Sequence, residues 1–153
     1  MDGSGQMAVA ERPGWMGLCA RAPGARLMEL VGALGPRPAF AWLRVPEIGS
    51  VMIRGRAGGT GAAFHLGEMT ATRGALRLSC GTVGHGWVQG RDKAACEAAA
   101  LVDALMQTGA AARVRAAVLE PLEREALAQR RARAAKAAAT RVEFFTLVRG
   151  EDQ

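Results

Sequence analysis

Residues 75–89, ALRLSCGTVGHGWVQ, give the clearest indication of the fold class. Leu76 and Leu78 alternate with polar residues, and this period of two is typical of a strand with one solvated face. Cys80-Gly81 lies between this run and the next, and it predicts a tight hairpin turn. Strands joined by so short a turn pair in the antiparallel sense. The segment therefore predicts antiparallel β-structure.

Other short runs with strand character precede this hairpin, and glycines separate them. Val51 and Ile53, for example, alternate with Met52 and Arg54. The full set of runs is Ala41–Val45, Val51–Arg54, Phe64–Thr72, Ala75–Ser79 and Val83–Gln89. Together they predict an antiparallel sheet of about four or five strands.

Helical spacing occurs on both sides of the sheet region. Apolar residues recur at intervals of three and four across residues 15–34, with a break at Pro23-Gly24. Asp92 is a good N-cap for a helix that runs to about Gln107. A short helix and then a longer one, opened by Pro121, complete the chain. The order of an N-terminal helix, antiparallel strands and C-terminal helices defines an α+β fold.

The length of 153 residues fits one domain with a real core. We expect residues 1–12 to be a disordered N-terminus and residues 13–153 to form a single domain. No apolar run is long enough for a membrane span, and the N-terminus lacks the basic and apolar regions of a secretory signal. We therefore expect a cytoplasmic protein without a membrane partner.

The chain carries a formal net charge of +6, which favours phosphates or an acidic partner surface. Aromatic residues make up only 5% of the chain, which leaves few platforms for stacking nucleic-acid bases. The three cysteines contain no C-x-x-C pair, which argues against a zinc site and against a disulfide framework.

The densest motif is the segment from Arg54 to Gly61, in which two arginines enter a glycine-rich loop. Glycines let backbone N–H groups turn toward an anion, and arginines bind phosphate or carboxylate bidentately. The other interpretation is a hairpin loop with solvated arginines. The candidate residues for an anion, substrate or interface contact here are Arg54, Arg56, Gly58, Gly59, Thr60 and Gly61.

Several further residues are candidates for the same kinds of contact. His65, Glu68 and His85 could support a small free-standing enzyme, although histidines at such positions more often serve no catalytic role, and no third metal ligand is evident. We therefore expect no metal. Where the last predicted strand meets a helix N-terminus, the residues can be interpreted either as an anion site or as a simple N-cap. The remaining candidates are Arg73, Arg91, Asp92 and Lys93.

The C-terminal region is basic and then apolar. The arginine-rich helix of residues 124–141 could lie along nucleic acid, which makes a basic nucleic-acid-binding module the alternative function, but a solvated helix face is commoner. Apolar residues next to a terminus usually dock on the chain's own core or on another subunit. The partner-interface candidates are Arg141, Phe144, Phe145 and Arg149.

Three long segments resemble one known family. They are VPEIGSVMIRGRAGGTGAAFHLGEMTATRGALRL (45–78), GTVGHGWVQGRDKAACEAAALVDALMQ (81–107) and RVEFFTLVRGED (141–152). In this order, from about Trp15 to Asp152, the chain resembles the G subunit of the bacterial carbon–phosphorus lyase core complex.

This resemblance implies a subunit of a transferase complex that is inactive alone. In the family, an alkylphosphonate displaces adenine from ATP to give a ribose 1-phosphonate 5-triphosphate. ATP, with Mg, is then a substrate of the complex, and this chain binds no cofactor of its own. The implied partners are the sibling H, I, J and L subunits in a hetero-oligomer, with no nucleic acid. The resemblance assigns no catalytic residue to this chain.

Overall fold

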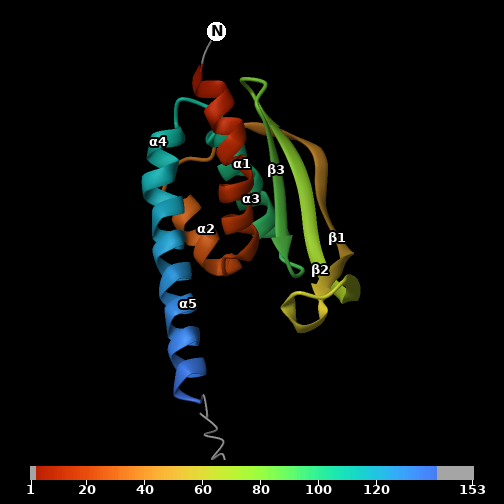
Figure 1. The fold of residues 1–153 in the computed structure, drawn as a ribbon. Helices are drawn as coiled ribbons and strands as arrows, with labels where there is room; N and C mark the ends of the chain where they lie inside the picture. The colour runs from red at the N-terminus through yellow and green to blue at the C-terminus, as the bar shows by residue number, and fades with distance from the viewer. Residues whose placement is uncertain (1–2, 141–153) are drawn as a thin grey trace, which may run out of the picture.

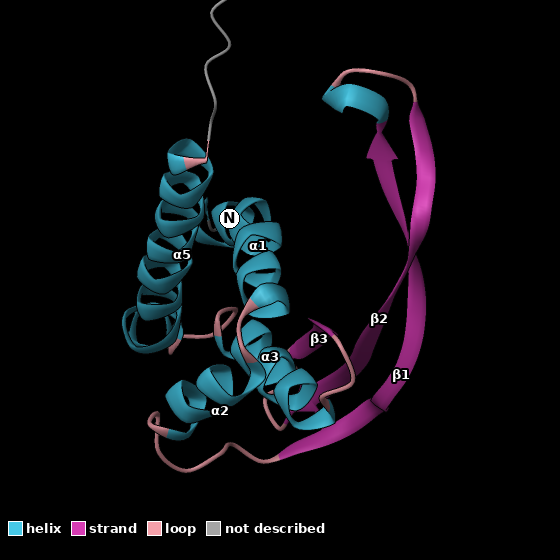
Figure 2. Ribbon diagram, turned by 90° about the horizontal axis from the view of Figure 1, so that it is seen from below, coloured by secondary structure: helices cyan, strands magenta, loops and turns pink. Residues whose placement is uncertain are grey.

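The computed structural model describes the backbone of residues 3–140 and the side chains of residues 11–140. One antiparallel sheet contains β1 (Phe40–Arg56), β2 (Ala63–Leu78) and β3 (Val83–Gln89) in that spatial order. Helices pack on one face of the sheet, and the other face is left uncovered in the described part of the chain (Figures 1 and 2). The α+β class and the order of its elements are as predicted.

The sheet has three strands, fewer than the four or five predicted. β1 contains both of the first two predicted runs, and β2 contains the next two. The intervening glycines do not end these strands, because they pair within the ladder, Gly49 with Ala71 and Gly74 with Gly86. Separate β-bulges shift the register between Trp42 and Arg44 and between Ile53 and Arg54. The predicted turn at Cys80-Gly81 is confirmed: Gly81 has a φ of 91° and donates to the Leu78 carbonyl at 2.9 Å.

The N-terminal helical region is split where the sequence predicted a break. α1 (Gly3–Arg21) ends before Pro23, and α2 (Gly24–Gly32) begins directly after it. The backbone of α1 extends into the segment for which we expected disorder. The assignment of residues 13–153 to one domain stays a prediction.

The C-terminal half is helical. Asp92 caps α3 (Lys93–Leu105) as predicted, because its carboxylate accepts a hydrogen bond from the Ala95 N–H at 2.9 Å. The two helices predicted after α3 follow one another directly. They consist of α4 (Ala111–Val114), a π-helical turn η2 (Arg115–Leu119) and α5 (Glu120–Ala139), with Pro121 in the first turn of α5.

α3 is the centre of the core. One side packs on Leu76 and Leu78 of the sheet, and the other packs on α1, α2 and the helical turn η2. Gly84 and Gly86 of β3 let α3 lie directly on that strand. A Cβ atom at either glycine would lie less than 3.0 Å from a backbone carbonyl oxygen of α3. These two glycines therefore set the distance between helix and sheet.

β3 pairs with β2 only from Ala71 to Arg77, so the rest of the β1–β2 hairpin extends beyond it. We call residues 50–70 the arm. The sheet curves around the helices, and its helix-facing side is concave while the opposite side is convex (Figure 2). Buried Leu76 and Leu78 mark the concave face, and exposed Arg73 and Arg77 mark the convex face.

Candidate functional site

The arm brings four of the candidate residues onto one face. Arg54 pairs directly with His65, and Arg56 lies two positions further along β1 on the same side. Glu68 pairs with Met52, which lies two positions before Arg54 on β1 and therefore on the same face. The register places these side chains on the concave face, and all of them are exposed to solvent. Arg54 and Arg56 therefore project from the same face of β1.

Two cations, Arg54 and Arg56, lie on the concave side of the arm at its end near the loop. Neither arginine has a carboxylate within ion-pair distance among the described side chains. Arg56 donates from Nη1 to the Gly61 carbonyl at 3.1 Å, which holds its guanidinium next to the loop. Two neighbouring guanidinium groups repel each other unless water or an anion lies between them. This end of the arm can therefore attract an anion.

The glycine loop itself is a compact turn. Residues 57–59 form a single 3-10 turn, in which Gly58 (φ 58°) and Gly59 (φ 81°) adopt the left-handed conformation. The N–H groups of Thr60 and Gly61 both point to the Ala57 carbonyl, the latter at 2.9 Å. These two donors are occupied within the turn. The loop consequently offers fewer open N–H groups to an anion than its sequence predicted.

The structure does not assemble His65, Glu68 and His85 into one site. His85 pairs with Ala75, ten positions along β2 from His65, which is roughly 30 Å of strand. His85 also lies on the convex face, whereas the other two lie on the concave face. Among the described residues, no group of three His, Cys, Asp or Glu side chains is close enough to hold a metal ion.

Arg73 and His85 share the convex face. Arg73 lies in β2 between Glu47 of β1 and Trp87 of β3, two positions along the strand from Ala75, the partner of His85. Both Arg73 and His85 are exposed. The candidate residues of the sheet are therefore divided between two opposite faces, which the spacing of these residues in the sequence did not indicate.

Asp92 occupies the helix N-terminus at which an anion site was considered. Besides capping α3, its carboxylate lies beside Gly24 at the start of α2, where an added Cβ atom would clash with Asp92 Oδ2. A carboxylate between two helix N-termini is favourably placed in both helix dipoles. Arg91 and Lys93 on either side are exposed. The N-terminus of α3 thus already has an anionic group supplied by the chain itself.

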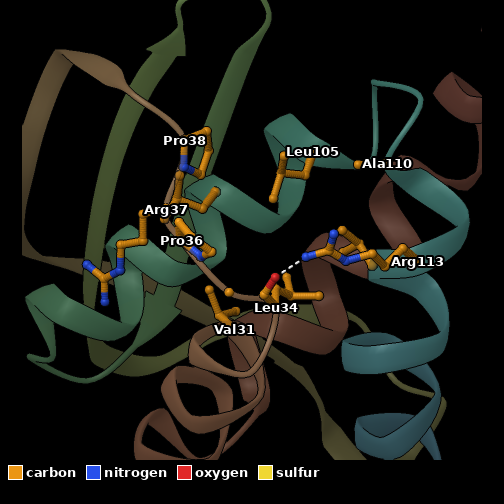
Figure 3. A pocket seen from close by; sticks show the side chains of 11 residues that line it. Val31, Leu34, Pro36, Arg37, Pro38, Leu105, Ala110 and Arg113 are labelled. Carbon is orange, nitrogen blue, oxygen red and sulfur yellow. Dashed lines mark hydrogen bonds between the residues drawn. The ribbon is translucent and has the colours of Figure 1, made fainter.

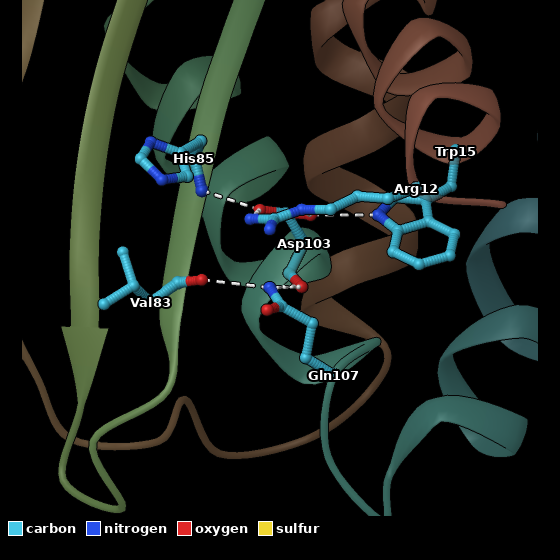
Figure 4. A network of polar contacts seen from close by, with 6 residues as sticks. All are labelled: Arg12, Trp15, Val83, His85, Asp103 and Gln107. Carbon is cyan, nitrogen blue, oxygen red and sulfur yellow. Dashed lines mark hydrogen bonds and ion pairs between the residues drawn. The ribbon is translucent and has the colours of Figure 1, made fainter. Parts of the chain in front are cut away.

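Sequence reasoning missed a buried polar network around Asp103. Its carboxylate accepts hydrogen bonds from Arg12 Nε (2.9 Å) and Nη2 (2.7 Å). It also accepts from Trp15 Nε1 at 3.0 Å and from the His85 N–H at 2.8 Å, while the imidazole ring of His85 points away (Figure 4). The signal in the sequence was an acidic residue within the apolar run of α3. Because every contact is satisfied internally, the network has a structural role.

A pocket of about 200 Å³ opens between α2, α3 and α4 (Figure 3). Its walls are mainly apolar, with Val31, Leu105 and Val114 among the lining residues. Two arginines reach it, but Arg37 forms an ion pair with Glu97, and Arg113 donates to the Leu34 carbonyl. None of the candidate residues from the sequence lines this pocket.

The basic part of α5 projects from the body of the protein. Residues 127–140 are exposed on all sides, and Arg130, Arg131, Arg133 and Lys136 are spread around the helix. The candidates Arg141, Phe144, Phe145 and Arg149 lie outside the described residues. Within residues 3–140, the structure contains no helix of the length and apolarity that crossing a bilayer requires.

The sequence that forms this fold matches a known family of proteins. A sequence model of the family described as phosphonate metabolism protein PhnG matches residues 10–150, which is nearly the whole chain. The chain therefore belongs to this family, and the resemblance seen in its three segments is confirmed.

A curated relative carries a more particular name. It is the alpha-D-ribose 1-methylphosphonate 5-triphosphate synthase subunit PhnG of Rhizobium meliloti (strain 1021). The two sequences are 45% identical over 149 residues, which cover 97% of this chain and 96% of the relative. The similarity thus extends over the sheet, the arm and the helices together.

Proposed function

We propose that this chain is a subunit of a synthase that makes α-D-ribose 1-methylphosphonate 5-triphosphate. The observation that supports this most strongly is the 45% identity, over nearly the full length of both chains, to a protein of that name. In this role the chain works with the sibling H, I, J and L subunits in a cytoplasmic hetero-oligomer. It is a component of a transferase and is inactive alone.

The reaction that we propose for the complex displaces adenine from ATP. An oxygen of the alkylphosphonate forms a bond to C1′ of the ribose, the bond from C1′ to adenine breaks, and adenine leaves after it gains a proton. The triphosphate stays on the ribose. Mg accompanies ATP as part of the substrate, and this chain binds no cofactor.

Displacement of this kind brings two highly charged anions together. Cations and oriented donors are needed to hold a triphosphate and a phosphonate side by side. The concave side of the arm supplies two such cations, Arg54 and Arg56, with His65 directly opposite Arg54. We assign Arg54, Arg56 and His65 an anion contact within the complex. Glu68 and Thr70 lie further along the same face of β2.

The test is reconstitution of the complex with and without this chain. We expect a tagged sibling subunit to retain the chain on purification, and the complex to release adenine from ATP and methylphosphonate. The chain alone releases none. A complex that forms and turns over equally well without this chain contradicts the proposal. So does a chain that binds none of the siblings.

A further inference from the structure

The convex face of the sheet is a regular surface that the described part of the chain leaves uncovered. All described α-helices lie on the concave side of the sheet, where α1 and α3 pack against the strands, so no helix of residues 3–140 covers the convex side of β2 and β3 (Figures 1 and 2). Trp87 lies on this face and is partly exposed. A sheet with one face on its own core and the other open can be stable in water if the open face is polar.

The strand register collects basic side chains at the centre of this face. Ala75 of β2 pairs with Arg44 on one side and with His85 on the other. Arg73 and Arg77 lie two positions before and after Ala75 on the same strand, and therefore project from the same face. Four basic side chains thus surround the methyl group of Ala75, those of Arg44, Arg73, Arg77 and His85.

These side chains are close enough to act together. Neighbouring strands are about 4.8 Å apart, and residues two positions apart on a strand are about 6.6 Å apart. Each of the four therefore starts within about 7 Å of Ala75. An arginine side chain is about as long as this distance, and the small side chain of Ala75 leaves the space between them open.

The charges of this cluster are largely uncompensated. Among the described residues, the acidic neighbour in this part of the sheet is Glu47, which pairs across the strands with Arg73 and lies 3.7 Å from Arg44 Nε in a half-exposed ion pair. Arg73 and Arg77 have no carboxylate within ion-pair distance among the described side chains. Like charges at this spacing are tolerated in water, and they become favourable only against an anionic surface.

The shape of the face favours a protein over a small molecule. Small ligands are held in concave pockets that cover most of their surface. The register places these side chains on the convex side of the sheet, whose curvature Figure 2 shows. Arginine and tryptophan are the residues enriched where protein interfaces bind most strongly. Arg73 and Trp87 are directly paired neighbours here.

We propose that the convex face is a docking surface for a carboxylate-bearing surface of a sibling synthase subunit, with Arg73 and Arg77 at its centre. This inference rests on the proposed function, because it requires that the chain assembles with siblings. The two arginines pair with carboxylates of the partner, and Trp87 packs against its surface beside them.

The first test is charge reversal in the co-expressed complex, with the full chain and a tagged sibling. The double variant R73E/R77E converts two attractive contacts into repulsive ones, and we expect the dissociation constant to rise by about a hundredfold or more. The matched control R130E/R131E makes the same change of charge on the exposed part of α5, and we expect it to assemble as the wild type does. The variant R73K/R77K retains the charge and should assemble, with greater sensitivity to salt.

The second test avoids substitutions. Phenylglyoxal modifies exposed arginines, and mass spectrometry of the wild-type complex identifies the modified positions. We expect Arg73 and Arg77 to be protected in the complex, while Arg130 and Arg131 react. Equal modification of all four arginines in the complex contradicts the proposed docking surface.

The remaining outcomes separate the inference from the function on which it rests. If the wild-type chain fails to bind any sibling, the proposed function is wrong. If R73E/R77E assembles with unchanged affinity, the docking surface is wrong and the proposed function stands. Unchanged assembly with a loss of adenine release indicates a ligand contact, and a self-dimer that R73E/R77E disrupts indicates a second copy. Either result overturns the docking of a sibling on this face.

Discussion

Arg12 and Asp103 form a two-bonded ion pair across the fold, although 91 positions separate them in the sequence. The side chain of Asp103 is 2% exposed, and the partner nitrogens lie 2.9 and 2.7 Å from its two oxygens. Because Asp103 also accepts from Trp15 and from the backbone of His85, it joins α1 and β3 to α3. The hydrogen bond to Asp103 raises the pKa of Arg12, so this arginine stays charged.

We expect Asp103→Ala to lower the free energy of unfolding by about 3–5 kcal/mol, because it leaves the buried donors of Trp15 and His85 and the Arg12 charge without their acceptor. Urea unfolding of the chain at high dilution, followed by tryptophan fluorescence, measures this loss. Glu123→Ala on the exposed side of α5 is the control, with an expected change below about 0.5 kcal/mol. Equal losses in the two variants contradict the structural role of the network.

The contact between α3 and β3 makes a second prediction. Gly84→Ala and Gly86→Ala each place a methyl group against the backbone of α3, so we expect a loss of about 3 kcal/mol or more, or failure to fold. Gly49→Ala is the matched control in β1, since no atom lies within 4 Å of its added Cβ and its φ is ordinary. Thermal unfolding compares the three variants. A tolerated alanine at either position of β3 would show that helix and strand lie further apart.

The arginines of the arm make a third prediction, about activity. We expect R54A/R56A to leave the complex assembled and to slow adenine release about ten- to a hundredfold, the effect of losing one charge-assisted contact to the transition state. R130A/R131A removes the same charge from α5 and is expected to have no effect. Loss of assembly in R54A/R56A assigns the pair to an interface. Normal assembly and normal turnover of R54A/R56A would contradict both a substrate contact and an interface role for the two arginines.

The cysteines are expected to differ in reactivity with pH. Burial, with a contribution from the charge of Asp103, raises the pKa of Cys19 to about 12, and burial raises the pKa of Cys96 to about 11. The hydrogen bond with Thr82, at 3.3 Å, lowers the pKa of exposed Cys80. Because the thiolate is the reactive form, a maleimide at pH 8 should label Cys80 alone in the folded chain.

Mass spectrometry of the labelled peptides checks the site of labelling. The rate at Cys80 should fall as the pH is lowered, since protonation removes its thiolate. Thr82→Val raises the pKa of Cys80 and should slow labelling at a given pH. Rapid labelling of Cys19 or Cys96 under native conditions is the result that contradicts their burial.

The arm predicts that the isolated chain associates with itself. Met52, Phe64 and Leu66 are 57%, 46% and 66% exposed, and a two-stranded ribbon has no interior in which to bury them. We expect oligomers or aggregates at tens of micromolar by light scattering, and a larger monomer fraction for M52S/F64S/L66S. A stable wild-type monomer at that concentration contradicts this prediction.

Local patterns in the sequence predicted much of the fold correctly. The alternation around Leu76, the turn at Gly81, the cap at Asp92 and the break at Pro23 all depend on neighbouring residues, and all are present. The strand count was wrong because glycines were taken as strand ends. A glycine inside a strand ends it only if no partner strand continues the ladder of hydrogen bonds, and a partner is not visible in local sequence.

The fold class, the order of the elements and the family can be read from the sequence alone, because periodicity, caps and long segments that match the family are properties of consecutive residues. Which residues share a surface depends on the tertiary structure. Strand register placed Arg54 and His65 on the concave face and Arg73 and His85 on the convex face. Register also depends on bulges and on the packing of α3 against Gly84 and Gly86. A shift of one residue reverses every side chain of a strand, so the site depends on contacts between residues distant in the chain.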